Sequence, residues 1–177
     1  MTRPAEPRSV ERVTSRVYRF IRAVRPGLSN IDRAIAEEWL SPEQLALFLT
    51  QSEADQRHAI AVARLLLTSG LAGRDLIVAA LLHDVGKRGA RFTPAHRTLI
   101  VILESYAPRL LQWLSRGRRN RWLAPFAVHA AHARAGSRLA HEAGASLRTA
   151  HLIRMHHEPA PGADQELAAL RWADDHA

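Results

Sequence analysis

The amino-acid sequence predicts an all-α protein, folded as a compact helical bundle with short extra helices near its N-terminus. Alanine and leucine dominate the 177 residues, β-branched runs are short, and apolar and polar residues never alternate long enough to make a strand. N-cap residues followed by apolar residues at helical spacing recur along the chain. A chain of this length is most simply one domain with a sizeable core.

Start and stop signals place the helices of the first half of the chain. Pro26-Gly27 ends the first apolar stretch, and Ser41-Pro42 combines an N-cap with a proline at the first helical position. The expected helices are 10–24, 31–40, one from Pro42 toward Ser52, one from Ser52 to near Gly70, and 74–84 with Gly86 as its terminator.

The second half carries the same kinds of signal. Thr93-Pro94 begins a helix toward Ala107, where Pro108 interrupts or kinks it before the segment continues to Trp113. The remaining expected helices are 125–143, closed by Gly144, one from Ser146 to near His157, and one from Asp164 to Asp175 after a loop stiffened by Pro159 and Pro161.

The gross composition limits the class of protein. The absence of cysteine excludes disulfides, thiolate zinc sites and cysteine nucleophiles, and it fits a reducing cytoplasm. The segment from Met1 to Ser9 lacks the apolar core of a secretory signal. The longest apolar stretches, such as 99–103, fall far short of the roughly 20 residues that span a bilayer. We therefore expect a soluble, cytoplasmic protein without a membrane span.

The net charge of +8 comes almost wholly from arginine, because Lys87 is the only lysine. Such an excess favours an anionic partner, whether a nucleotide, a nucleic acid or a lipid surface. A GC-rich genome that encodes arginine at any surface position that tolerates a cation is an alternative explanation of the excess. The densest cluster, residues 116–122, is expected to form an exposed basic turn between two helices.

The pair His83-Asp84 is the feature that points most directly to chemistry. It follows an apolar run and precedes Val85, Gly86 and Lys87. Burying an imidazole and a carboxylate together costs free energy unless a positive group compensates them. A divalent cation does so by taking lone pairs from both side chains. The pair therefore predicts a metal site.

Further residues of metal-ligand type lie in apolar helical contexts along the chain. Ten histidines are present, and His58, His132 and His156 are among those beside apolar runs. Asp174 follows a similar run on the last expected helix. Taken singly, such a histidine is more often a core residue satisfied by a backbone carbonyl. Their order and spacing carry more information than any one of them.

That order resembles the HD-domain superfamily of metal-dependent phosphohydrolases. The signature is His58, then His83-Asp84, then Asp174, and the resemblance covers about residues 55–175. His132, with Gly136 four residues on, and His156, eighteen residues before Asp174, resemble the two extra histidines of an extended, two-metal type. This type is similar to bacterial diadenosine tetraphosphate hydrolases of the HD class and to small uncharacterised bacterial HD proteins.

The resemblance implies a two-metal centre that hydrolyses a phosphoester or phosphoanhydride of a small phosphorylated substrate, most simply a nucleotide. Asp84 is expected to bridge the ions, with His58, His83 and Asp174 completing one site and His132 and His156 the other. These ligand types suit Mn²⁺, Fe²⁺, Co²⁺ or Ni²⁺ better than Mg²⁺, which favours oxygen. The expected catalytic residues are Asp84 and Lys87, and the expected substrate contacts are Lys87, Arg57, Arg134 and His129.

Two ligand positions stay open at the level of sequence. His129 lies three residues before His132 on the same helical face and is an alternative to it. His157 is an alternative to His156, but adjacent helical residues point about 100° apart, so both are not expected to reach one ion. The HD-GYP cyclic dinucleotide phosphodiesterases carry a paired His-His here, yet residues 157–162 lack their Gly-Tyr-Pro element.

Two other classes of function compete with hydrolysis. Some HD proteins, such as the myo-inositol oxygenases, hold a di-iron centre with the same ligand set and activate O₂. A regulatory nucleotide- or nucleic-acid-binding domain would instead rely on arginines such as Arg118, Arg119 and Arg121. Residues 51–177 are expected to form the HD domain, and residues 1–50 a helical extension that caps the core or forms a homodimer contact.

Overall fold

The computed structural model describes residues 29–88, 93–116, 122–158 and 164–177, and all regular structure in these ranges is helical. The prediction of an all-α fold is confirmed. The expected helix 10–24, residues 117–121 of the basic turn with Arg118, Arg119 and Arg121, and the loop that holds Pro159 and Pro161 lie outside the described residues.

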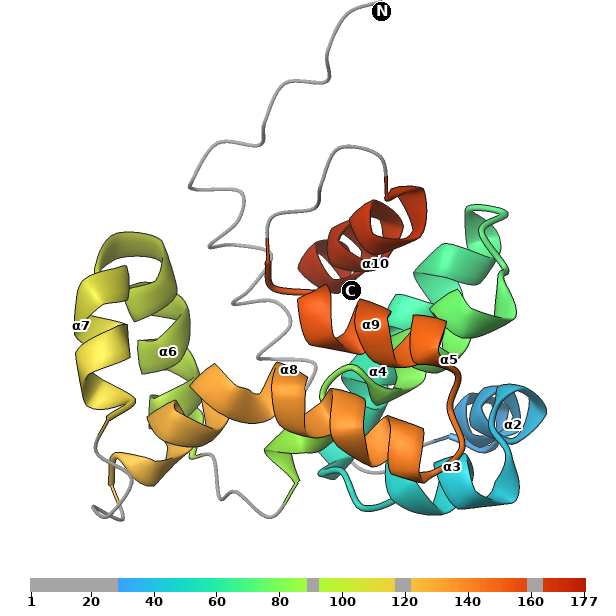
Figure 1. Ribbon diagram of the computed structural model, residues 1–177, viewed down its shortest axis with the longest axis horizontal. Helices are drawn as coiled ribbons and strands as arrows, with labels where there is room; N and C mark the ends of the chain where they lie inside the picture. The colour runs from blue at the N-terminus through green and yellow to red at the C-terminus, as the bar shows by residue number, and fades with distance from the viewer. Residues whose placement is uncertain (1–28, 89–92, 117–121, 159–163) are drawn as a thin grey trace, which may run out of the picture.

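The first half of the described chain forms α2 (Asn30–Trp39), α3 (Pro42–Phe48), α4 (Glu53–Thr68) and α5 (Arg74–Leu82), followed by the 3₁₀ turn η1 (Val85–Lys87) (Figure 1). Ser29, Ser41 and Ser52 cap the first three helices, because each side-chain oxygen accepts a hydrogen bond from a backbone amide in the first turn. Beyond α4, Gly70 adopts a φ of +77°, a conformation that glycine reaches without strain.

The second half forms α6 (Pro94–Tyr106), α7 (Pro108–Leu114), α8 (Ala124–Glu142), α9 (Leu147–Met155) and α10 (Gln165–His176). Thr93, Ser146 and Asp164 cap α6, α9 and α10, as the sequence predicts. Pro108 interrupts the chain rather than kinking a single helix, because α6 ends before it and α7 begins at it.

Helix α5 lies at the centre of the fold. Every residue from Leu76 to Leu82 is buried, so this helix is apolar all round. It packs against α4, α9 and α10, and residues of α2 and α3 such as Ala36 and Phe48 join the same core. Because α5 is buried on all sides, the two residues that follow it, His83 and Asp84, also lie in the interior.

Helix α8 connects this main core to a smaller one. Its first turns supply Phe126 to a cluster with Ile100 and Leu103 of α6, while its later turns pack against η1 and α9. Figure 1 shows α6 and α7 together at one end of the molecule, away from α4 and α5. Among the described helices, none is both long enough and apolar enough to cross a membrane.

The end of α5 differs from the prediction. The helix stops at Leu82 rather than Asp84, and Gly86 lies inside η1 without the positive φ of a glycine terminator. A Cβ added at Gly86 would lie 2.0 Å from the carbonyl oxygen of His132 and 2.7 Å from the amide nitrogen of Gly136. Glycine is therefore needed here for the close approach of α8.

Candidate metal centre

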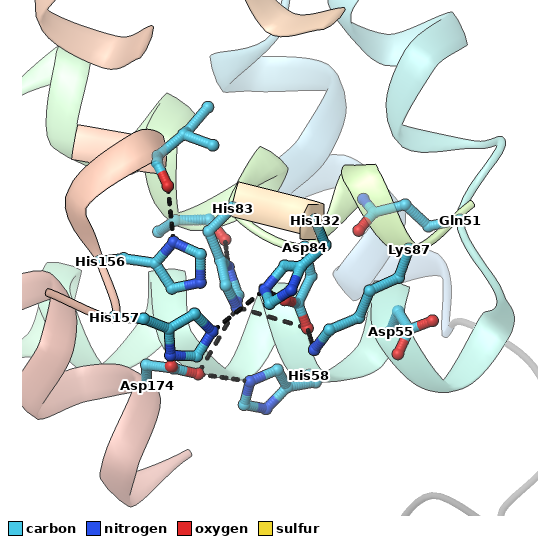
Figure 2. A network of polar contacts seen from close by, with 12 residues as sticks. Gln51, Asp55, His58, His83, Asp84, Lys87, His132, His156, His157 and Asp174 are labelled. Carbon is cyan, nitrogen blue, oxygen red and sulfur yellow. Dashed lines mark hydrogen bonds and ion pairs between the residues drawn. The ribbon is translucent and has the colours of Figure 1, made fainter. Parts of the chain in front are cut away.

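Seven side chains of metal-ligand type converge beyond the end of α5, as Figure 2 shows. They fall into three overlapping groups whose nitrogen and oxygen atoms lie within 4.8 Å of one another: His58 with His83 and Asp174, His83 with Asp84 and His156, and His132 with His156 and His157. These seven residues are called the His/Asp cluster below. The cluster contains all six residues that the sequence predicts as ligands, together with His157.

The cluster has two halves that meet at Asp84. In the first, His58 Nε2 donates a hydrogen bond of 2.8 Å to Asp174 Oδ1, and His83 Nε2 lies 3.5 Å from the same oxygen. In the second, His132 Nε2 lies 3.0 Å from His157 Nε2. Asp84 Oδ2 is 3.6 Å from His83 Nε2, and Asp84 Oδ1 is 3.3 Å from His132 Nε2. The two oxygens of Asp84 thus face the two halves.

Backbone carbonyls orient three of the histidine rings in the same way. His83 Nδ1 donates to the carbonyl of Ala80 over 2.9 Å, His156 Nδ1 donates to that of Ile153 over 2.6 Å, and His132 Nδ1 donates to that of His129. In each case the acceptor lies three residues earlier, at the end of a helix or within one. Such a bond fixes the ring and leaves Nε2 directed at the cluster, which is how metal-binding histidines are usually held.

Two of these Nε2 atoms indicate that the cluster fits a bound cation. The Nε2 atoms of His83 and His156 are fully buried and have no hydrogen-bond partner. Buried polar atoms are rarely left in this state, so the arrangement calls for a group that accepts lone pairs. Imidazole nitrogens combined with the carboxylates of Asp84 and Asp174 form a donor set typical of a divalent transition metal ion.

Two buried carboxylates, Asp84 and Asp174, lie at the centre of the cluster with cations beside them. Burial alone would raise the pKa of Asp84, but Lys87 and His83 hold it well below its usual range. Burial alone would likewise raise the pKa of Asp174, but His83 and His58 hold it well below its usual range. Burial tends to lower the pKa of His83, yet Asp84 and Asp174 raise it to about 9. Both acids therefore remain charged and attract positive charge to the space between them.

The histidines of the second half are neutral instead. Burial, reinforced by the positive charge of Lys87, lowers the pKa of His132 to about 4. Burial and His83 lower the pKa of His156 to about 3, and burial and His156 lower that of His157 to about 3. A metal binds only the neutral imidazole, so this half is in the protonation state that binding requires.

Lys87 sits against the cluster from η1. Its Nζ lies 2.6 Å from Asp84 Oδ2, and its side chain is 18 % exposed. Burial alone would lower the pKa of Lys87, but the carboxylates of Asp84 and Asp55 raise it above its ordinary value. A cation beside the cluster is therefore maintained at all physiological pH values.

The family model for the HD domain matches residues 56–177, which is more than half of the chain and includes the whole cluster. The chain belongs to the HD domain family. Searches of curated proteins and of solved structures found no match to it. Members of this family are typically metal-dependent phosphohydrolases. The HD pair itself is His83 and Asp84, at the junction of the two halves of the cluster.

Two glycines bring the HD pair against α8. A Cβ at Gly86 would overlap the backbone of α8, and a Cβ at Gly136 would lie 3.2 Å from Gly86 N and 3.4 Å from His83 O. Because neither residue has a side chain, η1 and α8 approach at backbone distance. His132, one turn before Gly136, is thereby held beside Asp84.

The predicted substrate-binding residues lie at different distances from the HD pair. His129 is half-buried near the cluster, with its ring centroid 5.3 Å from that of His132 and 6.0 Å from that of His157. Arg57 precedes His58 on α4, and its Nη1 lies 3.7 Å from Glu53 Oε2. Arg134 is exposed on α8, two residues after His132 and therefore on another side of that helix. Of the four residues predicted to contact substrate, Lys87 contacts Asp84 of the cluster and His129 lies beside His132 and His157.

The pairing of His156 with His157 differs from expectation. Both residues fall within one ligand group, and the two ring centroids lie 4.0 Å apart. The angle of about 100° between adjacent helical side chains does not hold for this pair, because α9 ends at Met155 and His157 lies beyond its cap. Proline disfavours helical conformation in the residue before it, so Pro159 was the signal in the sequence that the helix ends near His157.

Sequence reasoning did not single out Asp55. This buried residue lies in the first turn of α4, three residues before His58, and its carboxylate accepts a hydrogen bond from Ser52 Oγ over 2.5 Å. Residues three apart share a helical face, so its spacing from His58 was a signal that could have found it. Its negative charge acts on Lys87, which links α4 to the HD pair.

Proposed function

We propose that this protein is a metal-dependent phosphohydrolase that cleaves a phosphoester or phosphoanhydride bond in a nucleotide or a related small phosphorylated molecule. The observation that carries the proposal is the His/Asp cluster with its buried, unpartnered Nε2 atoms on His83 and His156. Its place in the HD domain family supports the same class of reaction.

The cluster divides into two sets of ligands. His58, His83 and Asp174 would hold one ion, and His132, His156 and His157 the other. The two oxygens of Asp84 face both sets, which supports its role as the bridging ligand. The mixed nitrogen and oxygen donors suit Mn²⁺, Fe²⁺, Co²⁺ or Ni²⁺. When bound, such ions lower the pKa of a water molecule and polarise a phosphoryl oxygen.

The remaining chemistry belongs to side chains beside the cluster. Lys87 carries a persistent positive charge next to Asp84, and a substrate phosphate that enters from the solvent side would meet it there. His129, near His132 and His157, is the second residue placed to contact substrate. The positive charge of Lys87 beside the cluster favours an anionic substrate, which supports a nucleotide, including a dinucleoside polyphosphate.

A metal-by-substrate screen combined with elemental analysis of the purified protein tests the proposal. We expect bound transition metal and release of phosphate or a nucleotide from at least one phosphorylated substrate. His83→Ala and Asp84→Ala should abolish both metal uptake and turnover. His151→Ala, which changes an exposed histidine of α9 outside the cluster, is the matched control and should change neither.

Three results would overturn the proposal. Full activity in His83→Ala or Asp84→Ala would remove the cluster from the reaction. Bound iron with O₂ consumption and no phosphorus product would assign a di-iron oxygenase. Loss of function on substitution of Arg118, Arg119 and Arg121, with the cluster variants unaffected, would assign a regulatory or nucleic-acid-binding domain.

A further inference from the structure

Asp55 is buried more deeply than its place at the start of a helix requires. It is 5 % exposed, and its carboxylate accepts a hydrogen bond of 2.5 Å from Ser52 Oγ, the N-cap of α4. The same Ser-x-x-Asp spacing begins α2, where Asp32 accepts from Ser29 Oγ over 2.7 Å with a side chain that is 20 % exposed. Burying a carboxylate costs free energy that capping does not demand. The burial of Asp55 therefore indicates a second role.

The side chain that connects Asp55 to the His/Asp cluster is Lys87. Figure 2 shows the Lys87 ammonium with the Asp84 carboxylate on one side and the Asp55 carboxylate on the other. Nζ is bound to Asp84 Oδ2 over 2.6 Å. Burial alone would lower the pKa of Lys87, but Asp84 and then Asp55 raise it. The ammonium thus occupies one carboxylate and faces a second.

The carboxylate that Lys87 occupies is the one that the proposed metal centre shares between its halves. Its two oxygens lie 3.6 Å from His83 Nε2 and 3.3 Å from His132 Nε2. An ammonium group and a divalent cation at one buried carboxylate repel each other, because a buried site screens charge weakly. Lysine carries its charge on a flexible four-carbon stem, so the ammonium can turn to another carboxylate while the backbone of η1 stays in place.

We propose that Asp55 is a positioning residue that receives the Lys87 ammonium when a metal ion binds Asp84 and holds it beside the occupied site. The inference rests on the proposed function, because it requires a metal ion at Asp84. Without the Asp55 carboxylate, the ammonium competes with the ion for Asp84 or turns to solvent. With it, the site accepts an ion and still keeps a cation at its edge, where it favours an anionic substrate.

Zn²⁺ binding in a double-mutant cycle tests this role without any substrate. Asp55→Asn should weaken Zn²⁺ binding about tenfold, because the displaced ammonium loses its acceptor. In the Lys87→Met background the same change should weaken binding by less than about threefold, since no ammonium is displaced. Asp55→Glu restores the carboxylate and should restore most of the affinity. Asp32→Asn, which removes the corresponding carboxylate of α2, is the matched control and should bind like the unchanged protein.

The lysine signal in NMR gives a second, direct readout. Because Lys87 is the only lysine, the full chain labelled with [ε-¹³C]lysine gives one lysine signal, and Zn²⁺ leaves it observable because the ion is diamagnetic. Zn²⁺ should shift this signal in the unchanged protein. In Asp55→Asn the metal-free signal should stay close to that of the unchanged protein, while the Zn²⁺-bound signal should become that of a solvent-exposed lysine. An Asp55→Asn protein that does not fold is replaced by Asp55→Ser.

The outcomes separate this inference from the proposed function. Equal weakening of Zn²⁺ binding by Asp55→Asn with and without Lys87 would overturn the inference, because the carboxylate would then act on the ion itself. A lysine signal that Zn²⁺ does not move would also overturn it, because Lys87 would remain at Asp84. Both results leave a metal-binding protein and so leave the proposed function standing. A chain that binds no transition metal ion at all would overturn both.

Discussion

Asp84 is the residue on which the electrostatics of the cluster depend most. It is buried, it contacts both halves of the cluster, and Lys87 is its closest cation, at 2.6 Å. A charged carboxylate in such a place is tolerated only while a positive group compensates it. In the metal-free protein Lys87 and His83 do so, and an ion at the same carboxylate would share that role.

Lys87→Met is therefore expected to destabilise the metal-free protein by about 3 kcal/mol, because Asp84 loses its closest cation. Saturating Mn²⁺ should recover most of this loss, since the ion brings positive charge to the same carboxylate. Denaturant unfolding with chelator and with Mn²⁺ measures both free energies. Arg64→Met is the control. The pair of Arg64 with Asp32 is also close, at 2.8 Å, but its Arg64 side chain is 45 % exposed, so we expect it to contribute less than about 1 kcal/mol. Equal losses in the two variants would contradict the argument.

At the scale of elements, the contact between η1 and α8 sets the shape of the cluster. Gly86→Ala is expected to cost about 3 kcal/mol, because the new Cβ would meet the backbone of His132 and Gly136, which cannot move without shifting α8. The same shift should weaken Mn²⁺ binding about tenfold by displacing His132.

Thermal and denaturant unfolding measure the stability cost, and Mn²⁺ titration measures affinity. Gly73→Ala is the control, since the Cβ there would meet only the end of the Glu166 side chain, at 3.1 Å, and Leu76 Cβ, at 4.0 Å. We expect it to change stability by less than about 1 kcal/mol. A Gly86→Ala protein as stable as Gly73→Ala would show that α8 is not held by this contact.

A second link between elements joins α9 to α10 through Arg148. Its Nε donates to Glu166 Oε2 over 2.8 Å, and its Nη1 and Nη2 donate to the two oxygens of Asp164 over 2.8 and 2.6 Å. Hydrogen bonds from Arg148, and then from the Leu167 amide, lower the pKa of Asp164 from 3.8 to about 2. The link therefore depends on pH only in acid.

The sign of that dependence follows from the lowered pKa. A carboxyl whose pKa falls on folding stabilises the protein above its unfolded pKa, and the contribution disappears as the pH falls through the folded value. Arg148→Met should therefore cost up to about 1 kcal/mol at pH 6, and this difference should shrink between pH 4 and pH 2. Urea unfolding of both proteins across this range measures it. A difference that grows in acid would refute the assignment.

At the scale of the whole molecule, local chemistry was predictable and long-range contact was not. N-caps such as Ser41, Ser52 and Ser146 depend on atoms within one turn, so the sequence indicates where their helices begin. The role of Gly86 depends on a helix some fifty residues later, and no local pattern contains that information. The ligand set came from the resemblance of its order and spacing to the HD signature, and the fold brings its members together. The direction of His157 follows from where α9 ends.

The cluster joins α4, the end of α5, α8, the end of α9 and α10, so metal binding is expected to stabilise the whole fold rather than one loop. A ligand that binds only the folded state at one hundred times its Kd adds about 2.7 kcal/mol. For a protein of this size that shift corresponds to about 5–10 °C in Tm. Removing metal with a chelator should lower the Tm by this amount, and Mn²⁺ should restore it, as differential scanning calorimetry measures. Because His83→Ala removes a ligand from one half and disturbs the other, its Tm should be the same with and without chelator. A chelator-sensitive Tm in that variant would place the stabilising metal outside the cluster.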